Sequence, residues 1–228
     1  MGSRTKARRI LTAAVAVCAL LAGMGPALAG PDIRSAVGLI LDHNGNRLYS
    51  RKAKEVRPIA SITKLMTAMV VLDARVPLDD PVTITEQDRD RLRWSRSRLY
   101  IDEATLSRRD MLRVSLMSSD NRAAHALGRT TFAGGTDAFV AAMNAKAEAL
   151  GMHDSNFADT SGLDARNVST AEDLVRLIHA ASQYPLIREI TSTGEFTARP
   201  YIETKRGPLQ YRNTNPLVRD SRWTVELS

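Results

Sequence analysis

Cysteine is almost absent from this sequence of 228 residues, and its single occurrence, Cys18, restricts the chemistry that the chain offers. Cys18 lies in an apolar run, residues 10–24, that follows four cationic residues and precedes an Ala-Leu-Ala site at residues 27–29. This pattern predicts a secretory signal peptide over residues 1–29, so we expect export to the periplasm or cell envelope. Residues 30–228 then contain no disulfide, no thiol nucleophile and no thiolate metal site.

Long apolar runs and metal-ligand patterns are also lacking after residue 29. No later segment has the roughly 20 consecutive apolar residues of a membrane-spanning helix, so no membrane anchor is predicted. The four histidines have no metal-ligand spacing, and we predict no metal and no other cofactor. The predicted leader has four cationic residues and no acidic one, so its removal lowers the formal net charge from +7 to +3. Strong binding to a polyanion is therefore not indicated.

An arginine-rich segment over residues 89–98 surrounds Trp94 and could suggest a nucleic-acid surface. Three aspartates, Asp88, Asp90 and Asp102, alternate with these arginines. We therefore interpret the segment as a solvated rim and predict no nucleic-acid partner.

The predicted elements run from strands to helices and back to extended segments after Phe196. Residues 35–50 predict two strands joined by a type I′ turn at Asn44-Gly45. Apolar residues at helical spacing predict a helix over residues 61–74 with one buried face. Later helices are expected to begin at capping boxes. The two boxes are Ser107 with Asp110 and Ser169 with Glu172. The order of elements favours an α+β fold.

Ser61 and Lys64 stand three residues apart at the start of the predicted helix. Side chains at positions i and i+3 of a helix lie on one face, within reach of each other. A serine hydroxyl needs a base to remove its proton, and a lysine is such a base only when burial or a second cation lowers its pKa from about 10.4. The pair is therefore a candidate nucleophile and general base. The helix N-terminus would add N–H groups and partial positive charge near a developing oxyanion.

The spacing alone does not establish catalysis, because Ser3 and Lys6 repeat it within the predicted signal peptide. In the alternative interpretation, Ser61 caps the helix and Lys64 is a solvated residue of the first turn. The surrounding motifs have to decide between the two.

A second candidate element is Ser119-Asp120-Asn121, which falls between two predicted helices. On such a turn, the Ser119 hydroxyl could relay a proton to a leaving group, and the Asn121 amide could orient a substrate carbonyl or the base amine. The alternative is a capping turn without a catalytic role, because all three residue types are common helix caps.

Together the two motifs resemble those of the low-molecular-weight penicillin-binding proteins. Further segments resemble the D-alanyl-D-alanine endopeptidase branch, and the likeness covers essentially all of residues 30–228. These segments are SRSRL (95–99), LMSSDNRAAHALGR (116–129), AMNAKAEALGM (142–152), TSGLD (160–164) and YPLIREI (184–190). The resemblance implies a β-lactamase/transpeptidase-like α+β fold, in which an antiparallel sheet packs against a helical region with Ser61 on the helix between them.

The resemblance also implies a reaction on peptidoglycan peptides. Ser61 would attack a D-alanine carbonyl, and the acyl-enzyme would then be hydrolysed, with Lys64 as base and Ser119 and Asn121 assisting. In this branch the bond is usually the cross-link from D-alanine to the side amine of a diamino acid, with removal of a terminal D-alanine as a side activity. β-Lactams such as penicillin would acylate Ser61 as covalent inhibitors.

The family has a third motif, Lys-Thr-Gly, which we expect within a residue after Ser228. Its lysine would supply a second cation near Lys64, and its strand would bind the substrate. We therefore expect residues 30–228 to be an incomplete catalytic domain without its C-terminal strands. A non-catalytic wall-binding remnant is accordingly one alternative function.

A class A β-lactamase is the other alternative, because those enzymes also carry Ser-Asp-Asn. They use a glutamate roughly midway between the second and third motifs to activate the deacylating water. The corresponding stretch here offers Asp159 and Asp164 but no such glutamate. We therefore expect slow release of bound penicillin.

Overall fold

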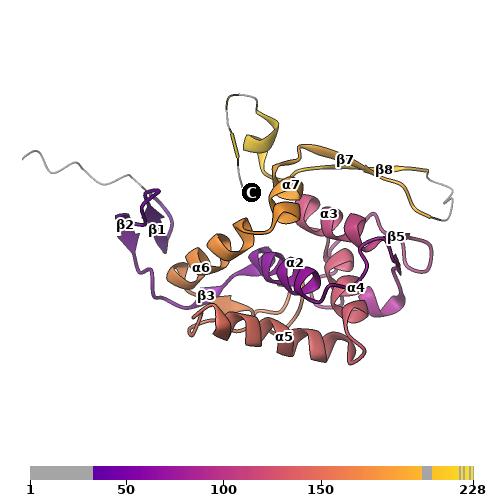
Figure 1. The fold of residues 1–228 in the computed structure, drawn as a ribbon, viewed down its shortest axis with the longest axis horizontal. Coiled ribbons are helices and arrows are strands. Elements are labelled where there is room, and N and C mark those ends of the chain that lie inside the picture. Colours follow the sequence, from indigo (N-terminus) through magenta and orange to yellow (C-terminus); the bar gives the residue numbers. More distant parts are fainter. Residues whose placement is uncertain (1–32, 202–206, 221, 223, 226, 228) are drawn as a thin grey trace, which may run out of the picture.

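The computed structural model describes residues 33–201, 207–220, 222, 224–225 and 227. The predicted signal peptide lies outside the described residues. Helices gather around one central helix, and short pairs of strands lie at the periphery (Figure 1). This arrangement confirms the expected α+β class.

The strands of the described residues form four antiparallel pairs rather than one continuous sheet. The pairs are β1 (Gly38–Leu41) with β2 (Arg47–Arg51), β3 (Arg57–Pro58) with β6 (Val168–Ser169), β4 (Pro81–Thr83) with β5 (Thr105–Ser107), and β7 (Glu195–Ala198) with β8 (Leu209–Arg212). The pair β3–β6 matters most for the site, because the chain leaves β3 directly toward Ser61.

The predicted hairpin β1–β2 is present, but its turn is not of type I′. That turn needs a positive φ at both central residues, and only Gly45, at +82°, has one. The carboxylate of Asp42 accepts hydrogen bonds from the backbone N–H groups of Asn44 (2.9 Å) and Asn46 (2.8 Å). The predicted turn type is therefore wrong, because this aspartate organises the loop through its own side chain.

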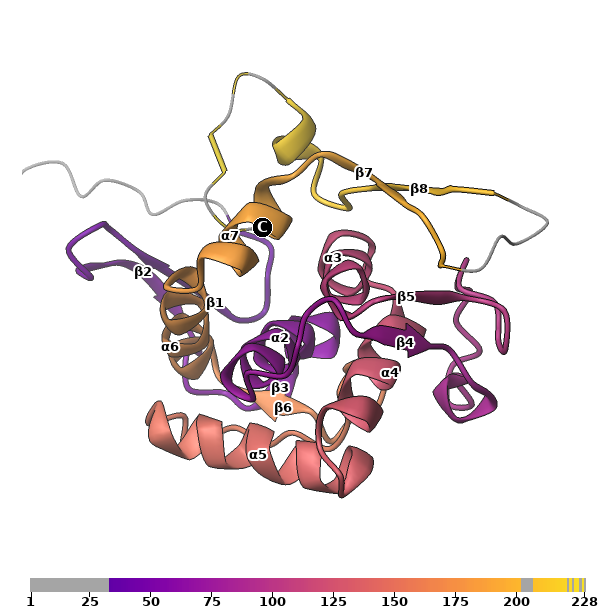
Figure 2. The ribbon, with the colours of Figure 1, turned by 45° about the vertical axis from the view of Figure 1, so that its right-hand side comes forward.

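Helix α2 (Thr63–Asp73) is the centre of the fold, and Figure 2 shows other helices arranged around it. It contacts α3 (Arg108–Ser118), α4 (Asn121–Thr131), α5 (Gly135–Ala149), α6 (Ala171–Ser182) and α7 (Pro185–Ser192). Most of its residues are buried, and Met66, Met69 and Val71 are fully so. The expectation of a single buried face is therefore wrong, since neighbours cover α2 on most sides. The other elements, three short 3-10 helices, are η1 (Ala60–Ile62), η2 (Glu86–Asp88) and η3 (Pro216–Arg219).

Helix starts agree with the predicted caps in one case and differ by one residue in another. At the start of α3, the N–H of Asp110 donates to Ser107 Oγ at 3.0 Å, which confirms this cap. At the start of α6, Thr170 rather than Ser169 accepts the N–H of Asp173, at 3.1 Å. Ser169 is instead the last residue of β6, so its backbone is already engaged in a strand pair.

Gly128 lies inside α4 and provides a close approach to the loop of residues 159–164. A Cβ atom at this position would lie 2.4 Å from Thr160 Cγ2 and 3.2 Å from Thr160 Cβ. Thr160 is fully buried and has little freedom to move away. The glycine therefore sets the distance between α4 and the loop.

We predict that Gly128→Ala lowers the free energy of unfolding by roughly 1–3 kcal/mol, because the added methyl overpacks the contact with Thr160. In an open helical site the same change would raise stability by about 0.5–1 kcal/mol. Urea unfolding measures the difference. Thr160→Ser removes the crowded methyl group and should recover part of the loss in the double variant. A stabilising effect of Gly128→Ala alone would contradict the proposed crowding.

Candidate active site

Ser61 lies in η1, a short 3-10 helix between β3 and α2. The strand pair β3–β6 and a hydrogen bond from the Ile59 N–H to the Asn167 carbonyl, 3.0 Å, fix the chain just before this turn. Ala60 then takes a left-handed conformation, φ +45°, which is uncommon for a residue other than glycine. As a result, Ser61 is exposed at the entrance to α2, while Lys64, one turn further on, is only 2% exposed.

This geometry rules out the alternative interpretation of Ser61 and Lys64. The N-cap of α2 is Ile62, and no side chain caps the helix there. Lys64 is buried rather than solvated. The serine is therefore free of a capping role, and the lysine amine faces the serine instead of water.

The structure brings all four predicted site residues together. Lys64 Nζ lies 3.0 Å from Ser61 Oγ and 2.8 Å from Asn121 Oδ1. Ser119 Oγ lies 2.7 Å from Ser61 Oγ. Ser61 thus contacts an amine and a second hydroxyl, and the amine is oriented by an amide from another helix.

The three residues of the Ser-Asp-Asn motif have separate tasks. Ser119 closes α3 with a left-handed φ of +56°, which turns the chain toward α4. The middle residue, Asp120, is the N-cap of α4, and its Oδ1 accepts the N–H of Ala123 at 3.1 Å. The capping interpretation therefore applies to Asp120, and the cap positions Ser119 and Asn121 on either side of it to reach Ser61 and Lys64.

The loop of residues 159–164 also contacts Lys64. The Asp159 carboxylate accepts backbone N–H groups from Ser161 (2.7 Å), Gly162 (2.6 Å) and Asp164 (2.7 Å). This turn directs the Ser161 carbonyl oxygen at Lys64 Nζ, 2.7 Å away. This role of Asp159 was not predicted from the sequence, although an aspartate shortly before Ser-Gly is a signal for a side-chain-stabilised turn.

Burial lowers the pKa of Lys64 from its ordinary value of 10.5 to about 8. The negative charges of Asp159 and Asp120 raise it and so limit the shift. From the sequence, either burial or a second cation was expected to lower this pKa. In the described residues, burial is the cause. A lysine with this pKa has a substantial neutral fraction near neutral pH, as a general base requires.

The SRSRL segment also reaches the site, through Ser95. Asn121 Nδ2 donates to Ser95 Oγ at 2.9 Å, and the Ser95 N–H donates to Asp90 at 2.7 Å. Burial raises the pKa of Asp90, but hydrogen bonds from the N–H of Arg93 and from Ser95 outweigh it and leave the pKa at about 2. Asp90 is therefore a buried anchor for the segment that orients Asn121.

A pocket of about 380 Å³ opens beside Ser61, with a mainly apolar wall that includes Ile62, Leu116 and Ile178. Within the described ranges, no group of three or more histidine, cysteine or acidic side chains is arranged to bind a metal. Across the same residues, no helix combines the length and the apolar character needed to cross a bilayer.

Comparison with solved structures defines the class of protein. The DD-transpeptidase of Streptomyces K15 is similar, with a TM-score of 0.76 and 27% identity over 86% of this chain and 79% of that chain. The chain therefore has a penicillin-binding transpeptidase type of α+β fold, as the resemblance implied.

The chain belongs to the D-alanyl-D-alanine carboxypeptidase family, peptidase S11, whose sequence profile matches residues 25–228. The D-alanyl-D-alanine endopeptidase of Escherichia coli K12 is 45% identical over 199 residues, which are 87% of this chain and 63% of that protein. The D-alanyl-D-alanine endopeptidase of Pseudomonas aeruginosa is 46% identical over 198 residues, 86% of this chain and 63% of that protein. The chain thus spans slightly less than two thirds of the length of either relative.

Gly162 gives a sharp test of how the loop of residues 159–164 supports Ser61. It has a φ of +85°, and a Cβ atom there would lie 1.8 Å from the carbonyl oxygen of Ala60 and 3.0 Å from the backbone nitrogen of Ser61. Gly45 has nearly the same φ, +82°, and an added Cβ would meet nothing within 4 Å.

We predict that Gly162→Ala destabilises the protein by well over the roughly 1 kcal/mol expected for the strained φ alone, and displaces Ser61. Gly45→Ala is the matched control and should show only the cost of the φ. Unfolding in urea and the rate of covalent penicillin binding are measured for both variants. Equal losses in the two variants would show that the contact with Ala60 is unimportant.

Proposed function

We propose that this chain carries the catalytic centre of a serine-type D,D-peptidase, which cleaves D-alanyl bonds of peptidoglycan through an acyl-enzyme on Ser61. The observation that carries the proposal is that Ser61 Oγ lies 3.0 Å from the amine of a buried lysine, Lys64, and 2.7 Å from a second hydroxyl, Ser119. Membership of the D-alanyl-D-alanine carboxypeptidase family supports the choice of substrate.

In the acylation step, the neutral amine of Lys64 takes the proton of Ser61 Oγ while this oxygen forms a bond to the D-alanine carbonyl carbon. Negative charge then develops on the carbonyl oxygen, and the positive end of the α2 helix dipole stabilises it. The carbon–nitrogen bond breaks, and the departing amine receives the proton from Lys64 through the Ser119 hydroxyl.

Deacylation reverses the roles of the same groups. Lys64 takes a proton from a water molecule, whose oxygen attacks the ester carbon. The ester bond to Ser61 Oγ breaks, and that oxygen takes the proton back from Lys64. Asn121 accepts a hydrogen bond from the amine of Lys64, 2.8 Å, and so holds it in place in both steps.

The preferred bond in this proposal is the cross-link from D-alanine to the side amine of a diamino acid, with terminal D-alanine as a second substrate. The E. coli and P. aeruginosa relatives are both named D-alanyl-D-alanine endopeptidases, which supports the first activity. The family description, D-alanyl-D-alanine carboxypeptidase, supports the second.

The contacts of two aspartates disfavour the β-lactamase alternative. The Asp159 carboxylate accepts three backbone N–H groups within its own loop. Asp164 forms an ion pair with Arg166, at 2.6 Å. Neither carboxylate is left available as a base for a deacylating water, which supports slow release of penicillin.

The proposal includes export and a division of the chain. Residues 1–29 act as a signal peptide, and residues 30–228 form part of a catalytic domain that works in the periplasm or cell envelope. The partners are peptidoglycan peptides, and β-lactams are covalent inhibitors. The match of the family profile over residues 25–228 supports this division.

We predict that fluorescent penicillin labels the complete natural protein on Ser61. The label should vanish in Ser61→Ala, which lacks the nucleophile, and fall by at least about a hundredfold in rate in Lys64→Ala, which lacks the base. Gel fluorescence and mass mapping of the adduct are the measurements. An adduct on another side chain would contradict the proposal, and rapid multiple turnover of nitrocefin would favour a β-lactamase.

The pH dependence of acylation tests the role of Lys64. Only the neutral amine accepts a proton, and the pKa of Lys64 is lowered to about 8. The acylation rate should therefore rise about tenfold per pH unit below pH 8 and level off above it. Stopped-flow measurement of penicillin acylation from pH 5 to 10 gives the profile. A rate that is flat between pH 5 and 7 would exclude Lys64 as the base.

A further inference from the structure

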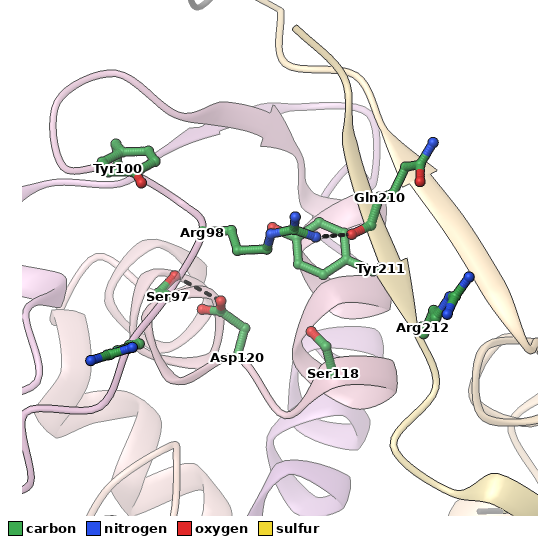
Figure 3. A pocket seen from close by; sticks show the side chains of 9 residues that line it. Ser97, Arg98, Tyr100, Ser118, Asp120, Gln210, Tyr211 and Arg212 are labelled. Atoms are coloured by element: carbon green, nitrogen blue, oxygen red, sulfur yellow. Dashed lines mark hydrogen bonds between the residues drawn. The ribbon is translucent and has the colours of Figure 1, made fainter. Parts of the chain in front are cut away.

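A second pocket, of about 580 Å³, lies beside the Ser61 centre. It is bounded by residues 96–100, by the C-terminal end of α3 and by strand β8 (Figure 3). Ser118 and Asp120 line it, and they are the chain neighbours of Ser119, whose hydroxyl contacts Ser61. The volume is within the range of small-molecule sites, roughly 300–1,000 Å³.

Tyr211 is the most informative residue of this pocket. Figure 3 shows its side chain extending from β8 into the pocket, between Arg98 and Ser118. Tyr211 is only 4% exposed, and its hydroxyl is buried without a hydrogen-bond partner among the described residues. A buried hydroxyl without a hydrogen-bond partner is unfavourable, so a bound group that accepts its hydrogen bond would be stabilised at this pocket wall. Burial, and then the charge of Asp120, raises the pKa of Tyr211, so its hydroxyl remains a hydrogen-bond donor.

Arg98 provides a cation next to this hydroxyl. Its guanidinium lies over the Tyr211 ring, 5.9 Å from the centroid, and its Nη1 donates to the Gln210 carbonyl oxygen. Both contacts fix the guanidinium at the pocket and lower the entropy that it would lose on binding a ligand. A guanidinium has five N–H groups, so donors remain for a ligand.

The charges around the pocket favour an anion. Arg96, Arg98 and Arg212 line it together with a single carboxylate, Asp120. That carboxylate is already engaged, because it accepts hydrogen bonds from the Ser97 hydroxyl, 2.7 Å, and from the capped backbone of α4. Arg212 pairs with Glu195 at 3.0 Å, but both side chains are more than two thirds exposed, so the pair is weak.

The interleaved aspartates do not cancel this charge. Asp88 is buried against Arg129, 2.8 Å away, and Asp90 is buried in its own loop, where it accepts backbone N–H groups. Their carboxylates are therefore turned inward, while Arg96 and Arg98 are exposed. Arg96 and Arg98 are therefore accessible to a ligand, whereas the carboxylates of Asp88 and Asp90 stabilise the fold.

We propose that this Arg98–Tyr211 pocket is a subsite for a carboxylate of the substrate peptide, borne by the diamino acid beside the bond that Ser61 cleaves. The inference rests on the proposed function, because it assumes a peptide held at Ser61. The Tyr211 hydroxyl and the Arg98 guanidinium donate hydrogen bonds to the carboxylate, and Arg96 adds positive charge. A carboxamide in place of this carboxylate would lack the negative charge and would accept fewer hydrogen bonds from the Tyr211 hydroxyl and the Arg98 guanidinium.

Binding measurements on the complete natural protein with Ser61→Ala test this subsite without turnover. The probes are two cross-linked peptide dimers that differ only in a carboxylate or a carboxamide on the diamino acid. We expect the carboxylate dimer to bind at least about tenfold more tightly, and Tyr211→Phe and Arg98→Gln each to remove most of that preference. A third dimer, amidated only at its terminal D-alanine, should bind as tightly as the carboxylate dimer. This result would exclude the terminal carboxylate as the source of the preference.

Tyr211→Phe is the decisive variant, because it removes a hydroxyl without a described partner and should not lower the melting temperature. Arg188→Gln, at an exposed position of α7 outside the pocket, is the matched control for charge and should have no effect. Equal binding of the two dimers, or an unchanged preference in Tyr211→Phe, would overturn the subsite. Penicillin acylation of proteins that retain Ser61 is measured in parallel. If penicillin does not acylate the unaltered protein, the proposed function is overturned, whatever the result of the dimer binding.

Discussion

The amine of Lys64 is buried and yet surrounded by oxygen atoms, and the rest of the site depends on this combination. Burial disfavours the protonated amine, while the negative charges of Asp159 and Asp120 favour it. The balance leaves a pKa of about 8. The oxygens of Ser61, Asn121 and Ser161, at 2.7 to 3.0 Å, orient the amine. A fully apolar surrounding would leave the amine mobile and without orientation, and a solvated one would keep it protonated. Each of the three oxygens comes from a different segment, so the whole helical core has to assemble before the base is functional.

The four candidate site residues could be identified from the sequence, because their two motifs together resemble those of a known family, whereas the spacing of Ser61 and Lys64 alone did not establish their chemistry. The spacing of Ser61 and Lys64 is a property of one helical turn, and the strands β1 and β2 follow from a local pattern. The burial of α2 on most sides could not be predicted in the same way, because it depends on helices that follow much later in the chain. The roles of Asp159 and Ser95 were missed for a related reason. Both act on Lys64 or Asn121 through contacts that only the tertiary fold creates.

The arginine-rich segment shows a second limit of sequence reasoning. Alternating charges in a sequence suggest a neutral, solvated surface, but the alternation says nothing about which side chains turn inward. Here Asp88 and Asp90 are 1% and 4% exposed, whereas their arginine neighbours face outward. Buried carboxylates that accept several backbone N–H groups stabilise loops, and a ligand at the surface cannot contact them. The charged groups that a ligand can contact on this rim are therefore mostly arginines.

Asp120 connects the catalytic centre with the neighbouring pocket, and its position carries an electrostatic cost. Its negative charge raises the pKa of Lys64, which opposes the neutral amine that catalysis needs. The same carboxylate caps α4 and accepts the Ser97 hydroxyl, and so positions Ser119, Asn121 and the wall of the pocket. Burial raises the pKa of Asp120. A shared cap of this kind keeps both walls of the cleft in one rigid arrangement. The proposed peptide recognition beside Tyr211 and the proposed proton transfer at Lys64 would then depend on different side chains on a common support.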